Sequence, residues 1–382
     1  LSGLPSTDHE NWKYTSSAQF IENFKKDGLI KKKAHYEIDL KNLKSPRLLF
    51  INGQLHLDAS LLSEAFKLKV GPITNFKEAS DFIPFFHAYD EINLIGIEEE
   101  VHVEVKAQSL EKQELYLYYF YFSDQSNNFH PSKLKLQLGE STQLILREEH
   151  IHQSPLVSSH ANNIQEITLN KEAKLEQIVV EASALENYSF GFCKRKVTLE
   201  NRAQFELNFF HLANKFKREE ILVMLKDREA RCEILGLGLG QNKGHIDHFI
   251  RVHHLARETF SRQLIKNIVK DQSRAVFTGL VYIDKYCSHC ESEQLNNNLL
   301  MDRLAHVDTR PQLEVLNHDV KCAHGATIGR FSDEELFYLC SRGIEPSLAT
   351  ELLGKAFAGE LLQSLKYPID QEKLQKTWEL YA

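Results

Sequence analysis

A cysteine and a histidine stand two positions apart near the C-terminal end of the chain, in the segment KCAHGATIGRF at residues 321–331. Side chains two apart in an extended strand lie on the same face, so Cys322 and His324 would point the same way. A thiolate and an imidazole could then bind one iron or zinc ion together. Such ions usually take about four ligands, so the pair alone is an incomplete site. A buried cysteine beside a hydrogen-bonded histidine is the competing interpretation.

A second pair of cysteines, Cys287 and Cys290, lies in the segment CSHC. The C-x-x-C spacing brings two sulfurs within reach of one ion, but no second C-x-x-C accompanies it, and His289 between the thiols cannot easily join the same ion. A thioredoxin-like role would need the motif to open a helix after a strand, whereas here it falls in a polar turn. We keep the pair as an alternative metal site.

Four histidines, at positions 245, 248, 253 and 254, lie in the segment GHIDHFIRVHH. In a strand, His248 and His254 would share a face and His253 would lie opposite. Solvated histidines are the commoner outcome, so we expect solvent-facing side chains rather than a metal cluster.

Other chemistry finds little support in the sequence. The glycines of GLGLGQNKG are not followed by Gly-Lys-Ser/Thr, so no phosphate-binding loop is predicted. No G-x-S-x-G elbow and no cluster of carboxylates on one strand face is present, which argues against serine hydrolases and glycoside hydrolases. Neither a nucleotide site nor hydrolase chemistry is therefore predicted from these motifs.

The elements that must position these residues are mostly strands. VHVEVKA, LYLYYFYF, KLKLQL and QLILREEHI alternate or run apolar over strand lengths, separated by Ser, Asn, Asp, Gly and Pro. Later strand-length segments each follow a charged turn and an alanine, at Ala173, Ala203, Ala230 and Ala275, with room for one further unit in SRQLIKNIV. Repeats of this size predict a solenoid, most simply a parallel β-helix, in preference to an all-β sandwich.

Helices are predicted at both ends of the chain. Residues 16–30 suggest a short helix that ends before a glycine. Near the C-terminus, Ser332 and Glu335 have capping-box spacing, and Gly343 ends that helix. A second helix from Pro346 carries one apolar stripe up to Leu361. This helical pair either caps the open end of the solenoid or docks a partner, and the pattern favours neither.

Composition limits the classes of function. The chain has 382 residues, a net charge of −7 and 42% hydrophobic residues, which is typical of a globular protein without general affinity for nucleic acid or anionic membranes. The longest apolar run, LYLYYFYF, is too short to span a bilayer. Six scattered cysteines and no cleavable leader before residue 20 predict a reducing compartment.

Four blocks, in order, carry a resemblance to a known family: GLPSTDHENWKYTS near the start, SRAVFTGLVYI, NNNLLMDRLAHVDTRPQLEVLNHDVKCAHGATIG, and DEELFYLCSRGI followed by AFAGELL. They resemble the SufB and SufD family of iron-sulfur cluster assembly proteins. SufB-like proteins read H-E-A-T where this chain has His324, Gly325, Ala326 and Thr327, and they carry a cysteine near the position of Asn296. Both features are missing here, so the chain is more similar to SufD.

The resemblance implies a mainly β fold: a right-handed parallel β-helix over residues 96–330, an N-terminal α/β region over 1–95 and a C-terminal helical region over 331–382. It also implies a cytoplasmic scaffold subunit that is not itself an enzyme and that pairs with a SufB-like subunit through β-helix edges. The bacterial cytosol is favoured and a plastid stroma is left open. Cys322 and His324 would lie at that interface, where a transient iron-sulfur cluster forms with ligands shared by the partner. A homodimer of the isolated chain and flavin binding both stay open.

The C-terminal helices would, by the same resemblance, dock a SufC-like ATPase, in which ATP hydrolysis resides. Glu351, Lys355 and Phe357 are the partner-binding residues that we predict there. The alternative function is a free-standing β-helix that binds metal through Cys287, Cys290 and nearby histidines.

Overall fold

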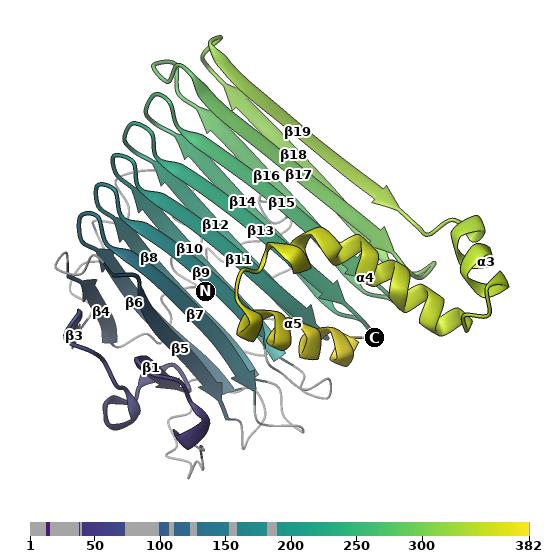
Figure 1. Cartoon of the computed structure of the whole chain (residues 1–382), viewed down its shortest axis with the longest axis horizontal. Coiled ribbons are helices and arrows are strands. Elements are labelled where there is room, and N and C mark those ends of the chain that lie inside the picture. The colour runs from purple at the N-terminus through teal and green to yellow at the C-terminus, as the bar shows by residue number, and fades with distance from the viewer. Residues whose placement is uncertain are drawn as a thin grey trace.

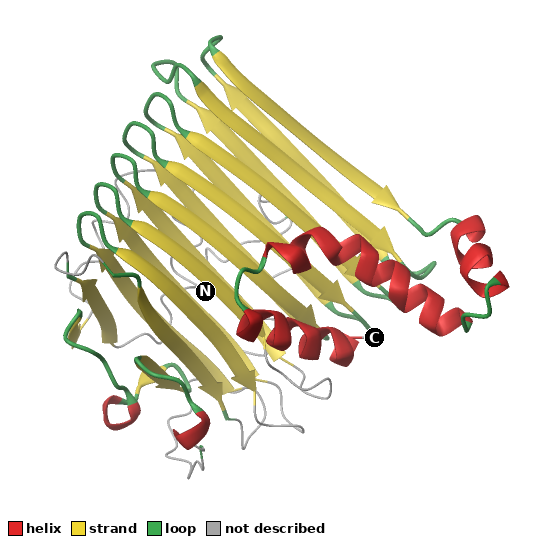
Figure 2. Ribbon diagram, viewed as in Figure 1, coloured by secondary structure: helices red, strands yellow, loops and turns green. Residues whose placement is uncertain are grey.

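The structure, a computed structural model, describes residues 13–15, 38, 40–72, 99–106, 111–122, 128–152, 159–181 and 189–381. The helix predicted over residues 16–30 lies outside these residues. Within them, strands form two sheets and three α-helices follow near the C-terminus (Figures 1 and 2). None of the described helices is both long and apolar enough to cross a membrane.

The first sheet, called sheet A, has ten strands in the described part of the chain. From its C-terminal edge inward it is built from β19 (Val320–Gly329), β17 (Cys290–Leu300), β15 (Phe260–Val269), β13 (Arg231–Gly240), β11 (Gln204–Ala213), β9 (Lys174–Glu181), β7 (Gln143–His152), β5 (Gln113–Tyr121), β1 (Arg47–Ile51) and β2 (Gln54–Leu55).

The second sheet, sheet B, has nine described strands. In the same direction these are β18 (His306–Val315), β16 (Arg274–Ile283), β14 (His245–His254), β12 (Phe216–Leu225), β10 (Ser189–Leu199), β8 (Ser159–Leu169), β6 (Asn128–Leu138), β4 (Glu99–Val105) and β3 (Phe66–Pro72). The short 3-10 helices Leu40–Asn42 and Leu57–Ala59 flank β1 and β2.

From β4 onward the chain alternates between the two sheets, and each strand pairs in parallel with the strand two places along. This is a parallel β-helix, which confirms the predicted fold class (Figure 1). The first strands depart from the pattern, because β3 pairs with β4 antiparallel and β2 pairs with β1 antiparallel. The predicted region boundaries near residues 95 and 330 stay predictions.

The corners that precede the sheet A strands explain the repeat in the sequence. Ala173, Ala203 and Ala230 each follow a residue with positive φ and enter a strand, and each is fully buried. Thr259 and Cys290 occupy the same place in the next two turns, after Glu258 and His289, which also have positive φ. Ala275 does not belong to this series, because it lies inside β16. The prediction that it continues the repeat is therefore wrong.

Apolar side chains fill most of the interior, the space between the two sheets. Inward positions of successive strands stack in rows, such as Leu144, Leu175, Phe205 and Cys232 on neighbouring strands of sheet A. Because each turn covers the apolar face of the previous one, burial is continuous along the solenoid and ends only where the last strands have no successor.

The C-terminal helices are α3 (Asp333–Ser341), α4 (Pro346–Ser364) and α5 (Pro368–Tyr381). The predicted capping box of Ser332 and Glu335 is present, and Gly343 has φ +86° after α3. The later part of α4, together with α5, packs on the outer face of sheet A through Leu361 and Trp378. α3 lies beyond that face, next to the start of α4 (Figure 1). Helix α5 was not predicted.

Candidate metal site at the open end of the β-helix

Strand β19 is the last strand of sheet A and pairs with β17 on one side. The parallel register sets Cys290 beside Val320, Ser292 beside Cys322 and Gln294 beside His324. Since Cys290, Ser292 and Gln294 are buried, Cys322 and His324 lie on the interior face of their strand. The two residues are thus brought together on one face, as the spacing predicts, at the open end of the β-helix.

The two side chains differ in their exposure. Cys322 is half-buried and packs against Cys287 and Cys290, whereas His324 is exposed. Burial and the neighbouring thiol of Cys290 raise the pKa of Cys322, and a backbone hydrogen bond at Ser292 partly offsets this rise. The thiol therefore keeps its proton near neutral pH, and a metal ion that binds it must displace that proton.

Beneath these residues the interior is lined by uncharged polar side chains from β15 and β17, the neutral polar cluster. Its members are buried inward-facing hydroxyls and amides: Ser261, Gln263, Asn267, Ser292, Gln294, Asn296 and Asn298. The amides bond to one another across the strands, with Nε2 of Gln294 donating to Oε1 of Gln263 at 3.2 Å and Nδ2 of Asn267 donating to Oδ1 of Asn298 at 2.8 Å. The interior thus changes from apolar to polar in the turns closest to Cys322 and His324.

A chain of hydroxyl groups leads from a buried histidine toward Cys322. Nε2 of His254 lies 2.8 Å from Oγ of Ser261, which lies 2.8 Å from Oγ of Ser292. The other ring nitrogen of His254 lies 2.7 Å from Oγ1 of Thr259. Burial lowers the pKa of His254 to about 3, so this imidazole is neutral and one ring nitrogen accepts while the other donates.

The CSHC pair lies in a buried corner. The thiol of Cys287 donates to the carbonyl oxygen of His254 at 3.4 Å, and the sulfur of Cys290 lies 3.1 Å from Oγ1 of Thr259. Burial, with the nearby Cys290 and Asp284, raises the pKa of Cys287 to about 11. Cys290 fills the same corner position that alanine or threonine fills in earlier turns, which is a packing role. The alternative metal site at this pair stays a prediction.

The described residues contain no larger group of metal-binding side chains. There, no three or more His, Cys, Asp or Glu side chains are grouped so that they could hold a metal ion. The histidines of β14 are also not solvated as a set, because His248 and His254 are fully buried in the interior. The expectation of solvent-facing histidines is wrong for these two, since the strand turns them inward. His245 instead lies 3.1 Å from Oγ1 of Thr15.

The predicted partner-binding residues all lie on α4. Glu351 and Lys355 form an ion pair of 2.8 Å and are each about one-third exposed, at 30% and 31%. Phe357 packs against sheet A, where Nζ of Lys266 lies 5.3 Å from the centre of its ring. Phe357 therefore helps to attach α4 to the β-helix.

Exposed apolar side chains gather on α3 and on the start of α4 instead. Phe337 is 74% exposed, Tyr338 59%, Leu348 47% and Leu352 41%. The predicted apolar stripe of α4 is thus only partly buried, at its later residues. Sequence reasoning did not single out Phe337 or Tyr338, although two neighbouring aromatic residues in a capped helix were a usable signal.

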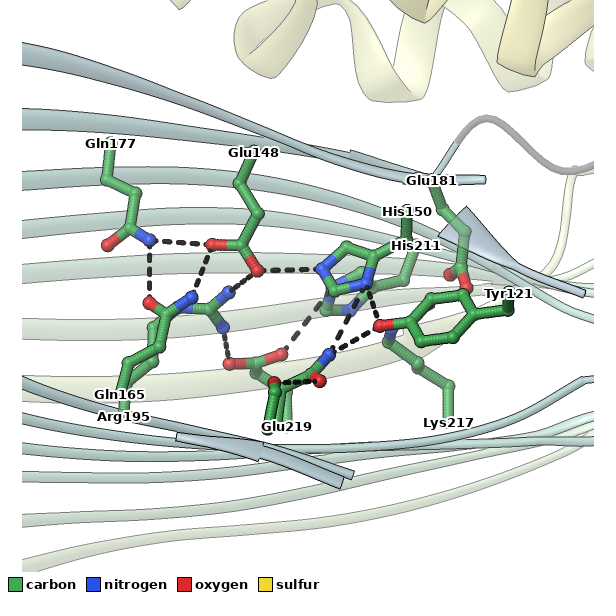
Figure 3. A network of polar contacts seen from close by, with 12 residues as sticks. Tyr121, Glu148, His150, Gln165, Gln177, Glu181, Arg195, His211, Lys217 and Glu219 are labelled. Atoms are coloured by element: carbon green, nitrogen blue, oxygen red, sulfur yellow. Dashed lines mark hydrogen bonds and ion pairs between the residues drawn. The ribbon is translucent and has the colours of Figure 1, made fainter. Parts of the chain in front are cut away.

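A second group that sequence reasoning missed is a buried set of charged residues deep in the interior, the ionic cluster (Figure 3). It comprises Glu148 and His150 of β7, Glu181 of β9, Arg195 of β10, and Lys217 and Glu219 of β12. Arg195 donates to Glu148 at 2.9 Å and also pairs with Glu219, while His150 lies 2.7 Å from Glu148. The sequence signal was charge at inward positions of apolar strands, as in QLILREEHI.

The carboxylates of the ionic cluster are held ionised. Burial opposes ionisation of Glu148, but Arg195 and His150 outweigh it, so the pKa of Glu148 is lowered. Burial likewise opposes ionisation of Glu181, and Lys217 and His152 lower its pKa to about 2. Arg195 and Lys217 are therefore the cationic partners that keep these buried carboxylates charged.

The chain matches the model of a known protein family. The model of the SUF system FeS cluster assembly SufBD core domain matches residues 121–357. That range contains most of the β-helix, both candidate ligands and the first part of the helical region.

Three curated relatives show the range of similarity. The chain is 30% identical over 376 residues to the iron-sulfur cluster assembly protein SufD of Escherichia coli, covering 96% of this chain and 86% of that protein. It is 30% identical over 225 residues to a SufBD family protein of Synechocystis, covering 58% and 49%. It is 28% identical over 192 residues to SufB of Bacillus subtilis, covering 50% and 41%. The chain thus spans less than half the length of the latter two.

Proposed function

This chain belongs to the SufBD family of iron-sulfur cluster assembly proteins, and we propose that it is the SufD-like scaffold subunit of a complex with SufB-like and SufC-like partners. In this proposal the chain supports formation of a nascent cluster and performs no ATP hydrolysis itself. The nascent cluster is cargo that is assembled and passed on.

The observation that carries the proposal is the place of Cys322 and His324. Both lie on the interior face of β19, the last strand of sheet A, so a second β-helix that pairs with this edge would close over them. A thiol and an imidazole suit iron, and two donors from this chain leave room for ligands from the partner. The lining beneath them is polar but uncharged, so no cation competes for the two donors.

The chain's own residues have distinct tasks in this proposal. Cys322 keeps its proton until an iron ion binds the sulfur and displaces it, because burial and Cys290 raise the pKa of this thiol. His324 is exposed beside it and can offer a ring nitrogen to a metal ion. Opening and closing of the interface by the ATPase partner would control when both donors are accessible.

Purification of this chain with SufB-like and SufC-like partners tests the proposal. We expect a stable complex, and we expect His324→Ala or Cys322→Ser to lower the iron and sulfide retained per complex by about tenfold or more. His318→Ala is the matched control, since His318 is exposed in the loop before β19. Absence of a complex, together with unchanged cluster formation in His324→Ala, would overturn it.

The SufC-like partner is proposed to dock on α3 and the start of α4. The exposed Phe337, Tyr338, Leu348 and Leu352 give this surface the apolar centre that protein interfaces need. A groove next to it is lined by Leu304 and other side chains of the corner between β17 and β18. Glu351 and Lys355 lie at the margin of this surface.

Binding of the ATPase to the purified chain checks this surface. Phe337→Ser should weaken binding by tenfold or more, about 1.4 kcal/mol, because an exposed aromatic anchor is lost, and the unfolding temperature should not change. Tyr286→Ser is the matched control, since Tyr286 is equally exposed, at 74%, but lies in a corner of the β-helix. Equal affinity of Phe337→Ser and the unmodified chain would remove α3 from the interface.

A further inference from the structure

Gln294 has a buried oxygen that lacks a partner next to the candidate ligand His324. The residue is 0% exposed, and its Oε1 makes no hydrogen bond. Leaving such an acceptor unpaired in the interior costs about 1–3 kcal/mol. A donor that joins this oxygen in the functional form of the protein would remove that cost.

The register shows where that donor can come from. Gln294 lies on β17 between Gln263 of β15 and His324 of β19, and all three face the interior. The Nε2 atom of Gln294 is already used on the Gln263 side, at 3.2 Å, which leaves Oε1 for the His324 side. Neighbouring strands are about 4.8 Å apart, so an imidazole in the next strand is within reach of the amide.

The residues around Gln294 leave space for its amide side chain. In the same interior row, deeper in the β-helix, the equivalent positions of β11 and β13 hold Leu207 and Ile234. On the opposite sheet, a Cβ atom at Gly279 would lie only 2.4 Å from Nε2 of Gln294, so the glycine makes room for this side chain. The row, which also holds the buried amide Gln177 on β9, thus carries two apolar side chains and then two successive amides in the strands before His324.

We propose that Gln294 is a positioning residue for His324, whose ring N–H donates to the Gln294 amide oxygen so that the other ring nitrogen faces the metal ion. The inference rests on the proposed role of His324 as a ligand. Histidines that bind metals usually donate their second N–H to a carboxylate, a carbonyl or water, which fixes the tautomer and the ring orientation. Here a side-chain amide takes that part.

Cobalt binding by the purified chain tests this without the assembly complex. Titration with Co²⁺ is followed by the thiolate-to-cobalt charge-transfer band that disappears in Cys322→Ser. Loss of the acceptor in Gln294→Leu should raise the cobalt Kd by tenfold to a hundredfold. Gln294→Glu keeps an acceptor at the same reach and should bind at least as tightly as the unmodified chain.

The order of the two variants separates positioning from packing. A packing role predicts the opposite order, because leucine suits a buried site better than a charged glutamate does. Asn298→Leu is the matched control, since Asn298 is a buried amide on the same strand but lies beside Ile328. It should leave the cobalt Kd within about twofold.

Several outcomes would overturn the inference. These are an equal Kd in Gln294→Leu and the unmodified chain, a Kd in Gln294→Glu as weak as in Gln294→Leu, an equal loss in Asn298→Leu, or no band that depends on Cys322 and His324. If His324→Ala abolishes cluster formation in the complex while Gln294→Leu binds cobalt normally, the proposed function stands and this inference alone fails.

Discussion

The interior of this β-helix is polar in two places, and the two are built differently. The ionic cluster in the first half buries full charges, with Arg195 between Glu148 and Glu219 and with Lys217 near Glu181. The neutral polar cluster near the open end uses only hydroxyls and amides. Buried charges need close partners of opposite sign, whereas neutral groups need only hydrogen bonds.

The two clusters share an interior row of sheet A. His211, beside the ionic cluster, is in register with Gly238, which is followed by Asn267 and Asn298. A Cβ atom at Gly238 would lie 2.5 Å from Oδ1 of Asn267 and 3.0 Å from Cε1 of His248, so this glycine gives space to both. Polarity therefore continues along the row while charge does not.

The difference in charge between the two clusters matches their positions, one deep inside the β-helix and one at its open end. Deep inside, every turn is covered by the next, so charged groups can be held permanently by their partners. At the open end, a cation or anion in the lining would compete with a metal for Cys322 and His324 or repel it. A neutral lining leaves the donors free and can be exposed and covered again at small cost in free energy.

The largest predicted effect is on the ionic cluster. Arg195→Met should lower the free energy of unfolding by about 3–5 kcal/mol, because Glu148 and Glu219 are left buried without their main cation. Urea unfolding of the purified chain measures this. The open-end counterpart, Ser292→Ala, removes one neutral hydrogen bond and should cost about 0.5–1.5 kcal/mol.

An exposed arginine, Arg202, provides the control for Arg195→Met. Arg202→Met removes an exposed arginine that pairs with Glu229 at a corner, and it should leave the free energy of unfolding nearly unchanged. If Arg195→Met proved no more costly than Ser292→Ala, the distinction between a charged and a neutral cluster would have no energetic meaning.

The sequence predicts the fold class well because its signals are local. Strands such as β4 show alternation, the corners repeat a small residue, and the capping box of α3 lies within four residues. The same period of two predicts that Cys322 and His324 share a face. The sequence of β19 itself does not show that it is the edge strand, since it reads like any inner strand. That follows only from the sheet order, in which no strand of the described residues pairs with the other side of β19.

The parts that were missed depend on contacts between turns. Glu148 and Arg195 are 47 residues apart, and Arg195 and Glu219 are 24 apart, so each segment alone shows only an isolated charge among apolar residues. Gln294 is informative only once its neighbours Gln263 and His324 are known from the register. The burial of His248 was mispredicted because a histidine's usual preference for solvent was applied to an inward position of a strand.

A smaller effect is predicted for the pH dependence of the free energy of unfolding, through a buried histidine. His248 is buried near the ionic cluster, and burial, aided by Lys217 and opposed by Asp247, lowers its pKa to about 4. In the unfolded chain its pKa is about 6.5. Below pH 6.5 the unfolded state therefore binds one more proton at this residue than the folded state, so stability falls as pH drops from about 6.5 to about 4.

His248→Gln removes that proton from the balance. Between pH 6.5 and 4 the free energy of unfolding of the variant should fall less steeply than that of the unmodified chain, by up to about 1.4 kcal/mol per pH unit. Urea unfolding at several pH values measures the slope. His318→Gln, an exposed histidine, should keep the original slope. An unchanged slope in His248→Gln would mean that His248 can be protonated in the folded state. The interior near Lys217 and Arg195 would then have to accept a further positive charge.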